Sequence, residues 1–303
     1  MTSQHDNYAN LAVAERDLKY FIFDWDNNIL HMPTRIHLER CDERGFWVPH
    51  SVSTAVFSVI RSDTETFRPP NGDWEEAFSD FRDVSVDNEN IFLRDTRLAI
   101  DRVMRGESDA APSFLKFKRT LVEGRLFAIV TARGHDPAVI RQGVEYFIET
   151  VLLPEDRRQM LRNLKGYLEC FDPGRGAVSD AEALDYYLSL NRYHGVMSEH
   201  FQRMVKERST AERTEGGKQF AIKDFVEHVI RIAREHGLDR PMSVGFSDDD
   251  MMNLRAVEDY IRERLAREFP SVKFVVYDTS DPELPAGRKV IVNGQLSLDF
   301  SGD

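Results

Sequence analysis

Two aspartates, Asp24 and Asp26, directly follow a short apolar run over residues 20–23 and could do nucleophilic or acid–base chemistry. The run predicts a buried strand, and side chains two apart on a strand point the same way. Both carboxylates would then project from the carboxyl end of a sheet, where open α/β sheets place their ligands. Two like charges there favour a nearby cation. The alternative is an ordinary turn, in which Asp26 and the following asparagines only hydrogen-bond locally.

A hydroxyl group ends a second apolar run, over residues 127–130, at Thr131. Ala132 and Arg133 come next, followed by a glycine turn and a helix that we expect to be capped at Asp136. Backbone N–H groups and the positive end of that helix would surround a bound anion. The alternative is an ordinary connection between a strand and a helix.

Two charged groups lie later in the chain. Lys218 opens a predicted helix, and a lysine in a first turn opposes the helix dipole, so it either points into solvent or balances a nearby negative charge. A third apolar run, over residues 242–246, leads into Asp248, Asp249 and Asp250. Oxygen-only ligands suit a hard ion such as Mg²⁺, although at least one of the three could instead cap the next helix in water.

The charge balance limits the partners of the chain. Its 303 residues include 40 Lys and Arg against 52 Asp and Glu, which gives a formal net charge of −12. Phosphate backbones and anionic lipid would repel such a protein unless a local basic patch overrode this field. Nucleic acid is therefore an unlikely partner, and we expect no membrane partner.

The two cysteines, Cys41 and Cys170, are too few and too far apart for a disulfide scaffold or a thiolate zinc cluster. No stretch approaches the ~20 apolar residues of a membrane span, and the start of the chain lacks the apolar region of a signal peptide. These features predict a cytoplasmic protein and leave its oligomeric state open.

Helical patterns separate the three apolar runs, and two more short runs, over residues 273–277 and 290–292, predict later strands. Strand, helix, strand, helix and strand predict an α/β fold with a Rossmann-like parallel sheet covered by helices on both faces. The gaps between the first three strands far exceed the ~30 residues of a bare βαβ unit, so we expect an insertion in each.

The predicted core comprises residues 1–31, 113–151 and 215–303. The first insertion, residues 32–112, is rich in aromatic residues, which we expect to form a small core of its own. The second insertion, residues 152–214, is predicted to be mainly helical. A charged stretch that ends at two glycines, residues 206–217, would connect it back to the core.

In this order, the four groups resemble the sequence motifs of the haloacid dehalogenase (HAD) superfamily of phosphohydrolases. Asp24 and Asp26 match the first motif and Thr131 the second. Lys218 fits the third best, with Lys223 as the alternative, and the acidic run from Asp248 matches the fourth. The resemblance covers about residues 18–31, 113–140 and 215–278. Two departures from it occur: Asn27 and Asn28 replace the commoner Gly-Thr pair, and Phe246 replaces a frequent aspartate of the fourth motif.

Both insertions leave the predicted sheet at its carboxyl end, so we expect them to form caps over the proposed site. The resemblance does not cover them, but it implies that Asp24 is a nucleophile forming an aspartyl-phosphate. It implies that Asp26 is the general acid and base, and that Thr131, Ala132, Arg133 and Lys218 bind the substrate phosphate. Mg²⁺ would be held by Asp24, the backbone of Asp26, Asp248 and Asp249, although which two of Asp248, Asp249 and Asp250 serve the metal stays open.

The function that follows is Mg²⁺-dependent hydrolysis of a phosphate monoester, with a small phosphorylated metabolite as substrate. Two alternatives remain. One is a HAD-like binding or regulatory protein without turnover, and the other is a phosphatase acting on nucleic-acid ends, which would require a basic groove.

Overall fold

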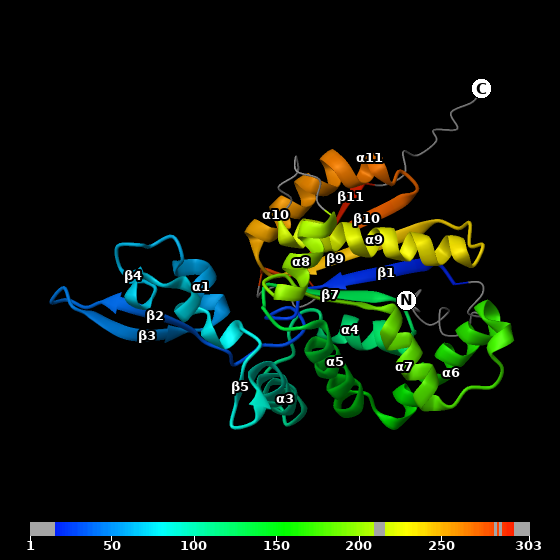
Figure 1. The fold of residues 1–303 in the computed structure, drawn as a ribbon, viewed down its shortest axis with the longest axis horizontal. Coiled ribbons are helices and arrows are strands. Elements are labelled where there is room, and N and C mark those ends of the chain that lie inside the picture. Colours follow the sequence, from blue (N-terminus) through cyan, green and yellow to red (C-terminus); the bar gives the residue numbers. More distant parts are fainter. Residues whose placement is uncertain (1–15, 209–215, 282–283, 285–286, 294–303) are drawn as a thin grey trace.

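The computed structural model describes residues 16–208, 216–281, 284 and 287–293, and its centre is a six-stranded sheet (Figure 1). The strands lie in the order β11-β10-β9-β1-β7-β8, and all are parallel except β11, which is antiparallel to β10. Their bounds are β1 Leu18–Phe23, β7 Phe127–Thr131, β8 Arg192–Gly195, β9 Met242–Asp248, β10 Val272–Asp278 and β11 Arg288–Asn293. The five strands predicted from apolar runs are confirmed, and the parallel arrangement of the first four explains why their runs are continuous rather than alternating.

Helices flank both faces of this sheet (Figure 1). On one side lie α4 (Phe114–Val122), α5 (Pro137–Val151), α6 (Pro154–Phe171) and α7 (Asp180–Leu190). On the other lie α8 (Glu199–Arg208), α9 (Gly217–Glu235), α10 (Met251–Tyr260) and α11 (Ala266–Glu268), with a π-helical turn, Ile261–Leu265, before α11. In α5 the buried residues Ile140, Val144 and Phe147 recur at the spacing of one helix face.

The connections reverse the strand order at β1. From β1 the chain continues to β7 and β8 on one side, and it then crosses to β9 on the other side of β1. Ligands of open α/β sheets bind at such a reversal of strand order. Phe23 pairs with Ser247, and the amide of Asp24 donates to the carbonyl of Ser247 at 3.0 Å. This register brings the residues after β1 beside the end of β9.

Residues 152–214 were expected to form a second insertion outside the core, and the structure differs from that expectation. β8 lies within this range and pairs in parallel with β7, as the edge strand of the main sheet. Leu164 of α6 and Tyr187 of α7 are buried in the same apolar core as β1 and β7. The range therefore extends the sheet by one helix–helix–strand unit. Part of the predicted connection back to the core, residues 209–215, lies outside the described residues.

Residues 33–90, which we call the projecting unit, extend away from the main sheet (Figure 1). Three antiparallel strands pair in the order β3-β2-β4, and a two-stranded ribbon of β5 and β6 follows. The bounds are β2 Ile36–Cys41, β3 Trp47–Val52, α1 Thr54–Ile60, β4 Phe67–Arg68, α2 Trp74–Ala77, β5 Ser85–Val86 and β6 Glu89–Asn90. Short 3₁₀ turns lie at Pro70–Gly72 and Ser79–Phe81, and another, outside the projecting unit, lies at Pro173–Arg175.

The projecting unit has a small apolar core that is separate from the main one and consists of Ile36, Leu38, Val52, Ala77 and Phe81. The expected aromatic core is thus only partly observed, since Phe46 and Trp74 are exposed. The rest of the predicted first insertion packs with the main sheet and its helices. α3 (Ile91–Met104) packs against α5, and its Phe92 is buried in the main core.

Within the described ranges, every helix is either too short or too polar to cross a bilayer.

Candidate functional site

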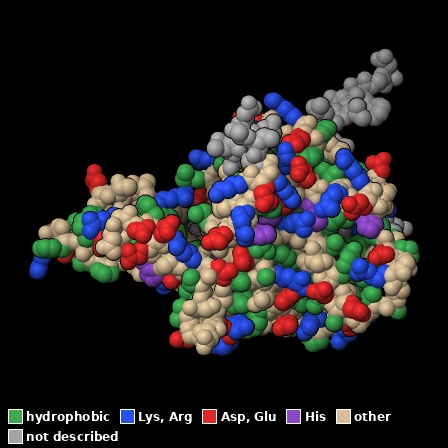
Figure 2. Space-filling view, viewed as in Figure 1, with side chains coloured by type: hydrophobic (Ala, Val, Ile, Leu, Met, Phe, Trp, Pro, Cys, Tyr) green, Lys and Arg blue, Asp and Glu red, His purple; other side chains and the backbone are tan. Residues whose placement is uncertain are grey.

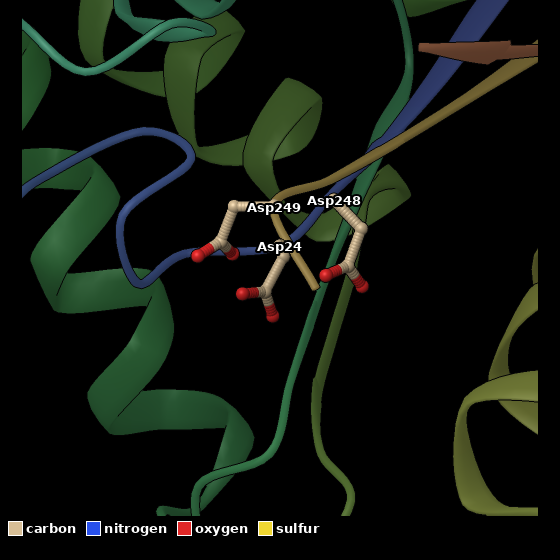
Figure 3. A group of neighbouring side chains, drawn as sticks. All are labelled: Asp24, Asp248 and Asp249. Carbon is tan, nitrogen blue, oxygen red and sulfur yellow. The ribbon is translucent and has the colours of Figure 1, made fainter. Parts of the chain in front are cut away.

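Three aspartates meet at the carboxyl ends of β1 and β9 (Figure 3). Asp24 follows β1, Asp248 ends β9 and Asp249 is the next residue. One carboxylate oxygen from each lies within 4.8 Å of the others, and the three groups face the same space. Asp24 is 6% exposed and Asp248 is fully buried. Close packing of like charges at a buried position is costly unless cations offset it, so this cluster is the strongest candidate for a metal site.

Lys218 supplies one such cation. Its Nζ donates to Asp248 at 2.6 Å and to Asp24 at 3.2 Å. It reaches them from the first turn of α9, a position at which its charge opposes the helix dipole and is answered by the carboxylates. Lys223, the alternative, instead donates to Glu268 at 2.7 Å. Of the two lysines, Lys218 is the one that the fold brings to the aspartates.

The pKa values reflect this crowding. Burial raises the pKa of Asp24 well above its usual range; Lys218 acts against this shift, and repulsion by Asp248 adds to it. Burial, together with repulsion by Asp248, raises the pKa of Asp249 to about 7. Burial by itself would lower the pKa of Lys218, but Asp24 and Asp248 outweigh it and raise that pKa. One ammonium group therefore does not neutralise the three carboxylates.

Asn28 fixes the loop that carries Asp24, a role that the sequence analysis missed. Its side chain is completely buried, and its Nδ2 donates to the carbonyls of Ser247 (2.8 Å) and Asp24 (3.3 Å). Its Oδ1 accepts from the hydroxyl groups of Ser247 (3.0 Å) and Thr279 (3.2 Å). Asn28 thus ties the loop after β1 to the ends of β9 and β10. The sequence offered one indication of this role, since Asn28 replaces the residue that is commoner at this position of the first motif.

Asp26 is held by partners from the end of β7 and the loop that follows. Thr131 Oγ1 donates to Asp26 Oδ2 at 3.3 Å. Arg133 binds both oxygens: its Nε donates to Oδ2 at 2.8 Å and its Nη2 to Oδ1 at 2.7 Å. Ala132 is exposed. The predicted residues of the second motif therefore lie beside Asp26, and Thr131 and Arg133 contact its carboxylate.

Arg133 differs from the expectation that it binds substrate. Its side chain is completely buried, and the two-point ion pair directs it at Asp26. His135, two residues further on, is also completely buried and packs against Phe92, with ring centroids 5.2 Å apart. Burial, reinforced by Arg133, lowers the pKa of His135 to about 4. No pattern in the sequence indicated that α3 would pack against this loop.

Asp250 points to other partners. Arg61, at the end of α1, donates to its two oxygens at 3.0 and 3.2 Å. Asp250 also caps α10, since its Oδ1 accepts from the amide of Met252 at 2.8 Å. Of the three consecutive aspartates, Asp248 and Asp249 join the cluster with Asp24, whereas Asp250 links the projecting unit to the rim of the site.

Comparisons of the chain with protein-family models, with curated proteins and with solved structures find no match. The resemblance to the HAD superfamily accordingly rests on the motif residues and on their positions in the sheet. Chemically, the site offers the buried carboxylate of Asp24 beside the ammonium group of Lys218. Asp248 and Asp249 add two carboxylates suited to a hard cation. Asp26, two residues after Asp24, offers a further carboxylate for proton transfer.

Proposed function

We propose that the protein is a Mg²⁺-dependent phosphatase of the HAD type that hydrolyses phosphate monoesters through an aspartyl-phosphate. The observation that carries the proposal is the cluster of Asp24, Asp248 and Asp249 with Lys218 at the reversal of strand order. An anionic nucleophile and an anionic substrate can approach each other only where cations are fixed, and this cluster supplies the ligands for them.

The residues have complementary parts in the two steps. An oxygen of Asp24 would attack phosphorus while the bond to the leaving oxygen breaks, and Asp26 would give that oxygen its proton. Asp26 would then take a proton from a water molecule, which attacks the phosphorus and releases inorganic phosphate and the free Asp24 carboxylate. Lys218 and Thr131 would bind the oxygens of the transferring group.

The donor set fits Mg²⁺. Asp24, Asp248 and Asp249 offer only oxygen ligands, and their mutual repulsion favours a divalent cation. The backbone carbonyl of Asp26 is the fourth expected ligand. A bound Mg²⁺ would neutralise charge on the phosphate and on the carboxylates.

A panel of phosphorylated metabolites, assayed for phosphate release with and without Mg²⁺, tests this function. We expect turnover that needs Mg²⁺ and disappears when a chelator is in excess. Full activity in excess chelator would show that the reaction does not need Mg²⁺. An absence of turnover on every ester would contradict phosphatase activity.

One observation favours a second candidate, a HAD-like binding protein without turnover. Both oxygens of Asp26 are paired with Arg133, whereas a proton-transfer group must reach the substrate. The two functions differ in a direct measurement: such a protein would bind inorganic phosphate with Mg²⁺ in calorimetry yet release none from esters. A nucleic-acid phosphatase has less support, because acidic and basic side chains are interspersed on the face in Figure 2 and no wide basic groove crosses it.

A further inference from the structure

Arg133 is a completely buried arginine that contacts the candidate proton-transfer residue and the projecting unit at the same time. On one side it forms the two-point ion pair with Asp26 described above, at 2.8 and 2.7 Å. A guanidinium fork bound to both oxygens of a carboxylate fixes the orientation of that carboxylate as well as its position.

On the other side, the same guanidinium touches the projecting unit. Its Nη2 donates to Thr34 Oγ1 at 2.7 Å, and its Cζ lies 4.6 Å from the centroid of the Phe81 ring. The neighbouring amide of Gly134 donates to the carbonyl of Phe81 at 2.8 Å. Phe81 belongs to the small core of the projecting unit. A shift of this unit therefore changes the surroundings of the guanidinium.

Thr34 is anchored in turn. Its hydroxyl donates to Asp95 Oδ2 at 2.6 Å, and Asp95 is buried on α3, where Arg94 pairs with its other oxygen at 2.9 Å. The contacts thus run without a break from Asp26 through Arg133 and Thr34 to α3. Breaking a buried ion pair leaves an uncompensated charge and is costly. When Asp26 turns toward a substrate, the charge of Arg133 must therefore stay compensated. This requires that Arg133 keeps its other contacts or moves together with Asp26.

We propose that Arg133 is a positioning residue that couples the location of the projecting unit to the orientation of the Asp26 carboxylate. The inference rests on the proposed function, because it takes Asp26 as the proton-transfer group. Substrate that displaces the unit would alter the packing of Phe81 on Arg133 and so free one oxygen of Asp26. With the unit as observed, both oxygens stay bound to Arg133.

The first test uses the leaving group. Arg133→Lys keeps the charge but loses the fork, so Asp26 would no longer be oriented. We expect kcat for alkyl phosphates, whose leaving oxygen needs a proton, to fall by about tenfold or more with little change in KM. For activated aryl phosphates the fall should be much smaller. Phe81→Leu should change the alkyl-to-aryl ratio in the same direction.

The matched control is Arg125→Lys, which removes a buried guanidinium that pairs with Glu123 at the opposite end of the sheet. It should lower kcat for both ester classes by the same factor or not at all. If Arg133→Lys lowered both classes equally, or behaved as the control does, a merely structural role would explain Arg133 and the proposal would be overturned.

A second test does not depend on turnover. Asp26→Asn should speed amide hydrogen exchange in residues 79–82 and at Gly134, because the carboxylate that holds Arg133 is lost, whereas Asp24→Asn should not. Equal exchange in the two variants would refute the coupling. If the wild-type protein hydrolysed no ester, the proposed function would fail, and the exchange experiment would still decide whether Asp26 and the unit are coupled.

Discussion

At the scale of residues, the site is defined by an incomplete charge balance. Asp24, Asp248 and Asp249 share one ammonium group, that of Lys218, and two of the three carboxylates have raised pKa values. Buried groups with strongly perturbed pKa values cluster at functional sites. The excess of negative charge is what a divalent cation would relieve, and this is why the cluster supports a metal-dependent reaction better than a purely structural role.

The nucleophile assignment predicts that Asp24→Asn abolishes phosphate release, with kcat lowered by at least about a thousandfold, because an amide oxygen does not displace an alcohol from phosphorus. Steady-state assays on the best ester of the panel measure this. The matched control is Asp250→Asn, which removes a neighbouring carboxylate outside the cluster and leaves an asparagine that still caps α10. Turnover retained in Asp24→Asn would exclude Asp24 as the nucleophile.

Metal binding has a readout that needs no substrate. Mg²⁺ in hundredfold excess over its Kd should stabilise the folded protein by about 2.7 kcal/mol and raise Tm accordingly. In Asp249→Asn this gain should shrink, and Tm without metal should rise because repulsion from Asp248 is relieved. Asp250→Asn should keep the full gain. Equal Mg²⁺ shifts in the two variants would contradict the assignment of Asp249 as a ligand.

At the scale of elements, the strands that carry the site were predictable, because β1, β7 and β9 are continuous apolar runs ending in polar residues. β8 was not: it has four residues, among them Arg192 and His194, and nothing in that pattern indicates a strand. The ion pair of Asp26 with Arg133 was also beyond prediction, because it depends on how loops from two strands meet. The motifs predicted which residues gather at the carboxyl edge of the sheet, but not which of them pair with one another.

The contact between β8 and α9 predicts a pH dependence of stability. Burial and the nearby Arg192 lower the pKa of His228 from 6.5 to about 4, against the effect of its bond to Leu190. Its Nδ1 lies 2.8 Å from Arg192 and 2.9 Å from Arg231, and its Nε2 lies 2.7 Å from the Leu190 carbonyl. The neutral ring therefore donates from Nε2 and accepts at Nδ1, and protonation of Nδ1 would break two hydrogen bonds.

A histidine whose pKa is lower in the folded state than in the unfolded state stabilises the fold fully above the unfolded-state pKa. This stabilisation is lost as the pH falls toward the folded-state pKa. For His228 the window runs from about pH 6.5 to 4, and about 2 kcal/mol would be lost between pH 7 and 5. His228→Gln should remove this share of the decline in the free energy of unfolding, measured by urea denaturation at both pH values. His200→Gln, at an exposed histidine of α8, is the control. An identical decline in wild type and His228→Gln would show that the ring is not held neutral.

At the scale of the whole molecule, the projecting unit stands beside the carboxyl edge of the main sheet, and α1 is tied to the site at both of its ends (Figure 1). Thr54, its first residue, accepts from Asn27 at 2.8 Å, and Arg61, just after its last residue, pairs with Asp250 at 3.0 Å. Asn27 and Asp250 each lie close in sequence to an aspartate of the cluster. Under the proposed function the core residues would supply generic phosphoryl chemistry, and the unit would then be the part of the molecule that selects substrates.

Because the projecting unit is held beside the carboxyl edge of the main sheet, we predict that compact substrates are preferred. Asp24 is only 6% exposed, and α1 is held to residues next to the cluster, so we expect a phosphate group on a bulky polymer to reach the carboxylate only if α1 is displaced. We expect kcat/KM for small phosphate esters to exceed that for phosphopeptides and for 3′- or 5′-phosphorylated oligonucleotides. Arg61→Ser, which releases the end of α1 while sparing the acidic cluster, should narrow this difference by raising kcat/KM for the polymers. A preference for polymers in the wild-type protein would mean that the unit is an open binding platform, and a ratio unchanged in Arg61→Ser would mean that the contact with Asp250 does not restrict access.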